Sequence, residues 1–258
     1  MFALIRFIGG SSISVFGAEG GLMFDGEALW NVFLMLLCYA YVLLVIFVSS
    51  RMYRSFHVSV KASRKFLHAM IGNLPFAIRF FTSNVYPVLV AAPFILVTLC
   101  VSRHSPFPRV AEKLAGLAGI TEEGHELGLV FYAVSYTVLA LVFASKPHVL
   151  AAGILPMAYG DAAASVVGER FGRRRHKFLA DKSLEGSLAM FLASLLSLSV
   201  GMVFLYALHF LSVSGTFFAV LGAATVVTLV ECFSPLGFDN LTVPISSALT
   251  FLALTGGL

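Results

Sequence analysis

Eight long apolar stretches constrain the fold of this chain more than any other feature. Each is close to the roughly 20 residues that a helix needs to cross about 30 Å of hydrocarbon in a bilayer. Apolar residues make up 59% of the sequence and charged residues 12%, about half the charged share of a soluble domain. We therefore predict an all-α, polytopic integral membrane helical bundle with about eight transmembrane helices, in a range of about seven to nine. The stretches run approximately over Leu29–Val48, Phe66–Phe81, Val85–Val101, Glu126–Ala144, Pro147–Gly168, Gly186–Leu211, Thr216–Cys232 and Leu241–Gly257.

The whole chain, residues 1–258, is expected to form a single transmembrane domain. Residues 1–28 are interpreted as an N-terminal interfacial segment or an extra short helix, because glycines and serines interrupt their apolar start. Residues 29–257 are expected to form the helical bundle, and residues 169–185 a basic cytoplasmic loop. No stretch resembles a soluble domain or a repeat of about 20 to 50 residues.

The basic residues indicate how the bundle is oriented. If the eight spans alternate, the loops 51–65, 102–125, 169–185 and 233–240 lie on one side, and they carry fourteen of the 17 Lys and Arg residues. Short loops rich in Lys and Arg face the cytoplasm. We therefore predict that this face is cytoplasmic. Orientation also explains the net charge of +4, so nucleic acid is not an expected partner.

Four carboxylates are expected near this cytoplasmic face. Asp161 lies inside the fifth span, Glu231 at the end of the seventh, and Glu185 and Asp239 at the starts of the sixth and eighth. A carboxylate in hydrocarbon costs at least about 2.5–3.5 kcal/mol, which makes an intramembrane acid a functional candidate. Mg²⁺ commonly takes one or two carboxylates together with substrate phosphates. Alternatively, Asp161 only pairs with a basic residue, and Glu185 is a first-turn residue favoured by the helix dipole.

The segment before the sixth span has the composition of a phosphate site. Lys182, Ser183, Gly186 and Ser187 surround a predicted helix start, where free backbone N–H groups attract anions. Either serine could instead be an ordinary N-cap. The preceding run 173–177 is densely basic and suits either a polyphosphate or anionic lipid headgroups.

Two further groups of residues are expected to face the same cavity. Asp161 and Ser165 share one face of the fifth span with Gly168, and that face offers little side-chain obstruction to a phosphate chain. Lys65 and His68 are three residues apart at the start of the second span, so they also share a helix face.

The order of these motifs resembles the CTP-dependent polyprenol kinases, which include dolichol and phytol kinases and their prokaryotic relatives. That family is distantly similar to the phosphatidate cytidylyltransferases. The resemblance covers residues from about 60 to 250. The motifs that carry it are Arg64-Lys65-x-x-His68, Tyr159-Gly160-Asp161-Ala162-Ala163-Ala164-Ser165-x-x-Gly168, Lys182-Ser183-Leu184-Glu185-Gly186-Ser187, Glu231, and Asp239-Asn240-Leu241-Thr242-Val243-Pro244.

The resemblance implies a membrane-embedded kinase. Such an enzyme transfers the γ-phosphoryl group of a nucleoside triphosphate, typically CTP, to the terminal hydroxyl of an isoprenoid alcohol, with Mg²⁺ as cofactor. The expected acceptor is a polyprenol, dolichol, phytol or geranylgeraniol, and the chain size suggests a prokaryotic cell membrane. The expected catalytic residues are Asp161, Lys65, His68, Lys182 and Glu231; the expected nucleotide-binding residues are Gly160, Ser165, Lys182, Ser183, Glu185, Gly186, Ser187 and Asn240; the expected metal ligands are Asp161, Glu231 and Asp239.

Two alternatives use the same residues differently. A cytidylyltransferase would form a CDP-activated lipid from CTP and a phospholipid, and would release pyrophosphate. An ion-coupled transporter would use Asp161 as its coupling carboxylate. A transporter predicts polar residues along the whole depth of the bundle, whereas the outward half of these spans is nearly free of them.

Overall fold

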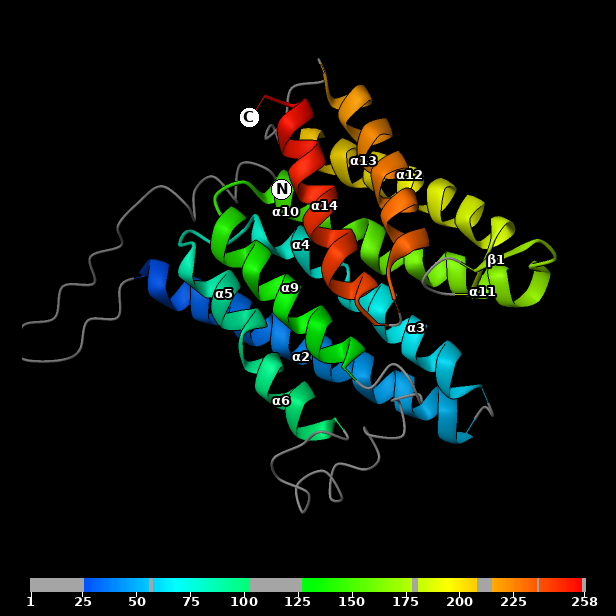
Figure 1. Ribbon diagram of the computed structural model, residues 1–258. Coiled ribbons are helices and arrows are strands. Elements are labelled where there is room, and N and C mark those ends of the chain that lie inside the picture. Colours follow the sequence, from blue (N-terminus) through cyan, green and yellow to red (C-terminus); the bar gives the residue numbers. More distant parts are fainter. Residues whose placement is uncertain are drawn as a thin grey trace, which may run out of the picture.

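The computed structural model describes residues 26–55, 58–102, 127–177, 181–207, 215–235 and 237–256, and within them the chain is a bundle of helices (Figure 1). Most of the predicted N-terminal segment 1–28 and nearly all of the predicted loop 102–125 lie outside these residues. The elements are α2 (Gly26–Ser55), α3 (Val60–Ile71), α4 (Leu74–Ile78), α5 (Val85–Ala91), α6 (Pro93–Val101), α9 (Gly128–Phe143), α10 (Pro147–Leu155), the π-helical turn η1 (Pro156–Gly160), α11 (Asp161–Phe171), β1 (Arg175–Lys177), β2 (Asp181–Ser183), α12 (Leu184–Ala207), α13 (Thr216–Phe233) and α14 (Asp239–Leu254).

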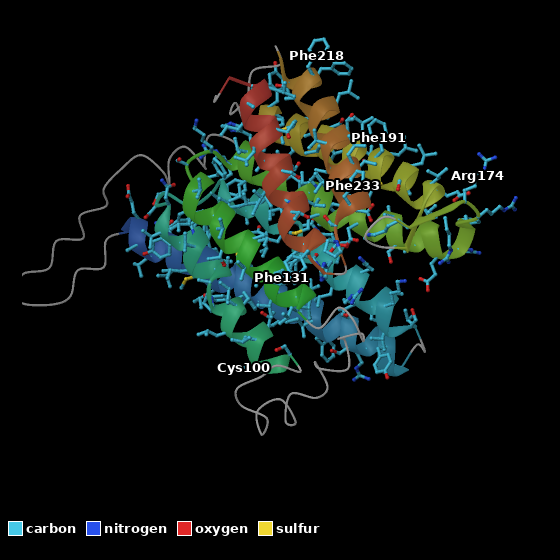
Figure 2. The ribbon with its side chains drawn as sticks, viewed as in Figure 1. Cys100, Phe131, Arg174, Phe191, Phe218 and Phe233 are labelled. Carbon is cyan, nitrogen blue, oxygen red and sulfur yellow. The ribbon has the colours of Figure 1, made fainter. Side chains whose placement is uncertain are left out.

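The prediction of an all-α membrane bundle is confirmed. Four helical segments of the described chain are long and apolar enough to cross a bilayer: 26–53, 147–171, 184–207 and 216–233. The strands β1 and β2 form one short antiparallel hairpin. Large apolar side chains such as Phe218, at the outer end of α13, are exposed on the surface of the bundle (Figure 2), which suits contact with lipid.

The second and third predicted spans are each broken in two. Gly72 and Asn73 separate α3 from α4, and Pro75 stands at the start of α4. A Cβ atom at Gly72 would lie 2.2 Å from the Cβ of Ala158, so this glycine permits close contact between the break and η1. Pro93 begins α6 directly after α5, because proline cannot donate the hydrogen bond that would continue the earlier helix.

One continuous helical segment, formed by α10, η1 and α11, runs through the middle of the bundle and positions Asp161. All residues of α10 from 148 to 155 are buried, and η1 and α11 continue this helix. Pro156 lacks the N–H that would bond to the carbonyl of Ala152, and the hydroxyl of Ser247 donates to that carbonyl instead, at 2.5 Å. The backbone N–H of Asp161 then bonds to the carbonyl of Pro156. Such π-helical turns occur frequently at functional sites.

Candidate functional site

A polar cavity of about 290 Å³ lies where α3, α11, the hairpin, α12, α13 and α14 approach one another. Its charged groups come from segments far apart in the sequence. The charged residues on its wall are Lys61, Arg64, Lys65, Asp161, Glu169, Arg175, Lys182, Glu231 and Asp239. Asp161, Lys182, Glu231 and Asp239, which were predicted at the cytoplasmic face, therefore lie in one pocket.

Lys65 and Asp161 form a buried ion pair on one side of this cavity. The ammonium of Lys65 donates to the Oδ2 atom of Asp161. The side chains are 11% and 8% exposed, so water screens the pair weakly. Asp161 is the first residue of α11, and Lys65 projects from α3, which packs against both η1 and α11. The pair thus fixes the start of α11 against α3.

Lys182 forms the second charged group, with Glu231 and Asp239. The short hairpin pairs Arg175 with Ser183 across its two strands, and it places Lys182 just before α12. The ammonium of Lys182 donates to Oε1 of Glu231 and lies 3.7 Å from Oδ2 of Asp239. Burial by itself would lower the pKa of Lys182, but the two carboxylates outweigh it and raise that pKa above its usual value. Lys182 is therefore held as a cation.

Small residues form the cavity wall between the two charged groups. Ser165, Gly168, Gly186 and Ser187 all line it. A Cβ atom at Gly186 would lie 3.1 Å from the carbonyl oxygen of Ala164 and 3.3 Å from Cα of Gly168, so α11 and α12 approach each other at this point.

The hydroxyls of Ser183 and Ser187 differ in what they contact. The hydroxyl of Ser183 accepts from the backbone N–H of Gly186 at 3.1 Å, which is the capping interaction that its position allowed. The hydroxyl of Ser187 lies 3.2 Å from the Sγ atom of Cys232. Ser187 thus contacts α13, whereas Ser183 stabilises the first turn of α12.

Four of the predicted site residues do not line the cavity. The ring of His68 packs against that of Tyr132, with 4.5 Å between their centroids. Gly160 packs against α12, where a Cβ atom would lie 2.3 Å from Oγ of Ser194. Glu185 accepts from the backbone N–H groups of Arg173 and Arg174 at 3.1–3.4 Å. Asn240 is buried, and its backbone carbonyl accepts from the hydroxyl of Ser135 at 2.7 Å.

Sequence reasoning missed the pair that Lys61 and Glu169 form at the partly exposed side of the cavity, at 3.5 Å. Lys61 precedes Lys65 by one helical turn, so helical spacing could have placed both on one face. Arg173, Arg174 and Arg175 of the basic run are all exposed, and of these three Arg175 lines the cavity. Figure 2 shows Arg174 projecting outward at the end of the bundle that carries the hairpin.

The carboxylate oxygens that line the cavity are suitable ligands for Mg²⁺ that binds together with a phosphate. Within the described residues, no three His, Cys, Asp or Glu side chains come together as a metal site of their own. Mg²⁺ is instead commonly bound by one or two carboxylates, with water and substrate phosphates completing its shell. Asp161 and Asp239 line the same cavity as Lys182, so hard oxygen ligands and a cation for phosphate are both present.

The fold and this cavity define a polytopic helical membrane protein with a charged, partly buried site. A phytol kinase of Synechocystis sp. is 45% identical over 133 residues, which cover 48% of this chain and 53% of that protein. A probable chloroplastic phytol kinase 1 of Oryza sativa is 28% identical over 205 residues, 75% of this chain and 64% of the relative. A probable chloroplastic phytol kinase 3 of Glycine max is 32% identical over 127 residues, 47% of this chain and 39% of the relative.

These homologues support the polyprenol and phytol kinase family that the order of the motifs predicted. The matches span from about two fifths to under two thirds of the length of these relatives. No family model matches the chain. No solved structure matches it either.

Proposed function

We propose that this protein is a membrane-embedded lipid kinase that transfers the γ-phosphoryl group of a nucleoside triphosphate, CTP, to the terminal hydroxyl of an isoprenoid alcohol. The observation that carries the proposal is the single cavity in which Lys65, Asp161, Lys182, Glu231 and Asp239 meet among apolar helices. A water-soluble nucleotide and a lipid-soluble alcohol can meet only at such a boundary. The similarity to proteins named phytol kinases supports both the reaction and the class of acceptor.

The charges of the cavity suit a triphosphate bound with Mg²⁺. Phosphoryl transfer depends mainly on positioning and on neutralising the charge of the transferred group. Lys182 would contact the phosphates, because it is cationic, partly buried and beside the small residues Gly186 and Ser187. Asp239 would hold Mg²⁺ together with the phosphates, and Mg²⁺ when bound neutralises phosphate charge. Glu231 would keep Lys182 in position.

Asp161 is our candidate for the group that receives the proton of the acceptor. The alcohol oxygen would lose its proton to this carboxylate as it bonds to the γ-phosphorus, and the bond from that phosphorus to the bridging oxygen would break to release CDP. The paired ammonium of Lys65 holds the carboxylate in place. His68, packed on Tyr132 behind Lys65, is assigned a positioning role.

The position of the label in the product tests the proposal. Purified full-length protein is incubated with Mg²⁺, phytol or geranylgeraniol, and CTP labelled at either the α- or the γ-phosphorus. Only γ-label is expected in the lipid, with CDP released in equal amount. Transfer of α-label to a phospholipid, with pyrophosphate released, would instead establish the cytidylyltransferase alternative. Replacing CTP by ATP, GTP or UTP determines the donor.

A lysine variant tests the assignment of the phosphate contact. Lys182→Ala should raise the KM for CTP by at least about tenfold, which corresponds to the roughly 1.4 kcal/mol of one lost charged contact, and should change the KM for the alcohol little. Arg51→Ala, which removes an exposed cation of α2 outside the cavity, is the matched control and should change neither. Equal effects of Lys182→Ala on both substrates would contradict the assignment.

A further inference from the structure

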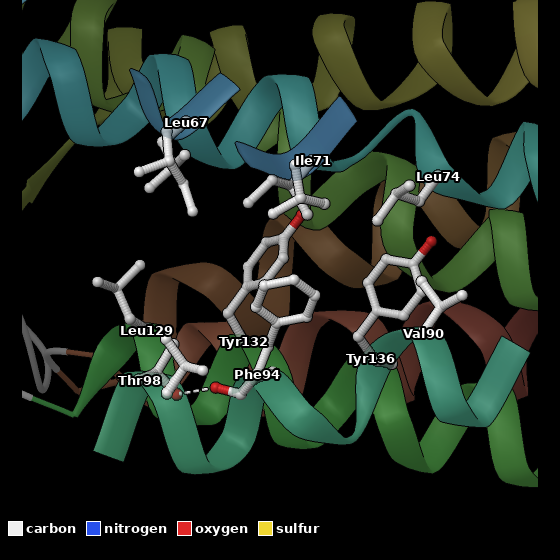
Figure 3. Close-up of a pocket in the computed structure, with 14 residues that line it drawn as sticks. Leu67, Ile71, Leu74, Val90, Phe94, Thr98, Leu129, Tyr132 and Tyr136 are labelled. Atoms are coloured by element: carbon white, nitrogen blue, oxygen red, sulfur yellow. Dashed lines mark hydrogen bonds between the residues drawn. The ribbon is translucent and has the colours of Figure 1, made fainter. Parts of the chain in front are cut away.

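A second cavity, of about 100 Å³, lies on the other side of α3 from the charged one, between α2, α3, α4, α5, α6 and α9. Figure 3 shows its lining: Leu67, Ile71 and Leu74 lie opposite Phe94, Leu129, Tyr132 and Tyr136. The lining side chains are apolar apart from the two tyrosines and Thr98. The hydroxyl of Thr98 donates to the carbonyl of Phe94 at 2.7 Å, within its own helix. This surface therefore suits hydrocarbon.

The helix α3 forms a wall common to both cavities. It presents Lys65 to the charged cavity, and Leu67 and Ile71 to the apolar one. Tyr132 lines the apolar cavity, and its hydroxyl donates to the backbone carbonyl of His68 at 3.1 Å. The ring of His68 also packs against that of Tyr132. Tyr132 and His68 thus lie at the wall that α3 forms between the two cavities.

The size of the apolar cavity limits what it can hold. A cavity of about 150 Å³ lined by apolar side chains stays dry and binds benzene. At about 100 Å³, this one suits a short branched hydrocarbon segment and is too small for a whole isoprenoid chain. The rest of such a chain would have to continue between the helices toward lipid.

We propose that this cavity binds the isoprene unit next to the hydroxyl of the acceptor alcohol, and that the hydroxyl reaches Asp161 past Tyr132 and His68. The inference rests on the proposed function, which supplies the class of lipid. It assigns the acceptor specificity to the apolar residues of α6 and α9. It also gives His68 a position at the boundary between the lipid and the nucleotide.

Binding of the alcohol without nucleotide tests the site separately from catalysis. Ala133→Leu replaces a methyl group on the cavity wall by an isobutyl group. It should raise the Kd for geranylgeraniol by at least about tenfold, or roughly 1.4 kcal/mol, and leave the KM for the nucleotide unchanged. Val138→Leu, on the same helix but 40% exposed, is the matched control and should leave the Kd unchanged. An unchanged Kd in folded Ala133→Leu protein overturns the proposal.

Photolabelling of the unaltered protein provides a second measurement, which tests the proposed lipid site even if Ala133→Leu fails to fold. A geranylgeraniol analogue with a diazirine in its first isoprene unit should label Phe94, Leu129 or Tyr132, and excess geranylgeraniol should displace it. Labelling confined to other segments would overturn the proposal, as would equal displacement by a straight-chain alcohol or a phospholipid.

The two proposals can fail independently. If the label enters the cavity but no nucleotide phosphorylates the alcohol, the lipid site stands and the kinase proposal fails. If γ-phosphoryl transfer occurs and the alcohol binds equally well to Ala133→Leu protein, the kinase proposal stands and the assignment of the apolar cavity fails.

Discussion

The buried pair of Lys65 and Asp161 should stabilise the fold as a unit, so that removing one partner costs more than removing both. Asp161→Asn keeps the shape of the side chain but leaves the ammonium of Lys65 without an anionic partner in a position that is 11% exposed. Breaking a buried pair in this way typically costs about 3–5 kcal/mol. In the double variant Lys65→Met, Asp161→Asn, no uncompensated charge remains from this pair. We therefore expect it to recover about 2–3 kcal/mol of that loss.

The exposed pair of Lys61 and Glu169 provides a matched control in the same cavity. Their side chains are 33% and 63% exposed, and their charged atoms are 3.5 Å apart. Pairs of this kind contribute about 0–1 kcal/mol because water competes for both charges. Lys61→Met, Glu169→Gln and their double variant should therefore differ little in stability from one another.

Unfolding of the purified protein in mild detergent measures both cycles. Denaturant titrations followed by loss of helical signal give the free energy of unfolding of each variant, and the coupling energy follows from the four values of a cycle. We expect a coupling of at least about 3 kcal/mol for Lys65 with Asp161, because each single variant leaves a buried charge unpaired, and below about 1 kcal/mol for Lys61 with Glu169. Additive effects at Lys65 and Asp161 would refute the buried pair and its role in positioning α11.

Two further predictions concern packing. Gly186→Ala should destabilise the protein by about 1–3 kcal/mol and lower its activity, because the new Cβ atom would meet backbone atoms of Ala164 and Gly168 at 3.1 and 3.3 Å; Gly26→Ala, with nothing within 4 Å, is the control. Tyr136→Phe should stabilise the protein by about 1 kcal/mol, because the buried hydroxyl of Tyr136 has no hydrogen-bond partner among the described residues. Thermal unfolding in detergent checks both, and a loss of stability in Tyr136→Phe would show that this hydroxyl has a bound partner.

The sequence sufficed to predict the bundle and the convergence of its acids, because both follow from features that do not depend on side-chain packing. Apolar run length identifies the membrane segments, and alternation of the spans puts Asp161, Lys182, Glu231 and Asp239 at one face. Alternation determines only the depth of each residue in the bilayer. It needs no knowledge of which helices are neighbours, and the cavity contains all four residues.

The direction in which individual side chains point could not be obtained in the same way. Glu185 precedes Gly186 by one residue, and adjacent residues on a helix face different directions. Gly186 lines the cavity, whereas Glu185 turns toward the backbone of Arg173. The apolar cavity was not predicted because it depends on the way Tyr132 and Phe94 pack between helices. A tyrosine in an apolar span carries no sequence signal for such a space.

The pairing of charges in the cavity bears on which ligand it can accept. In the structure, Lys65 neutralises Asp161, and Lys182 neutralises Glu231 and lies near Asp239. A phosphate ligand alone would draw the lysines away and leave buried carboxylates without partners, which is costly. A ligand that brings phosphate oxygens together with Mg²⁺ offers new partners to the lysines and to the carboxylates at once. The arrangement of buried pairs therefore supports the proposed binding of a nucleotide with Mg²⁺ rather than of a free anion.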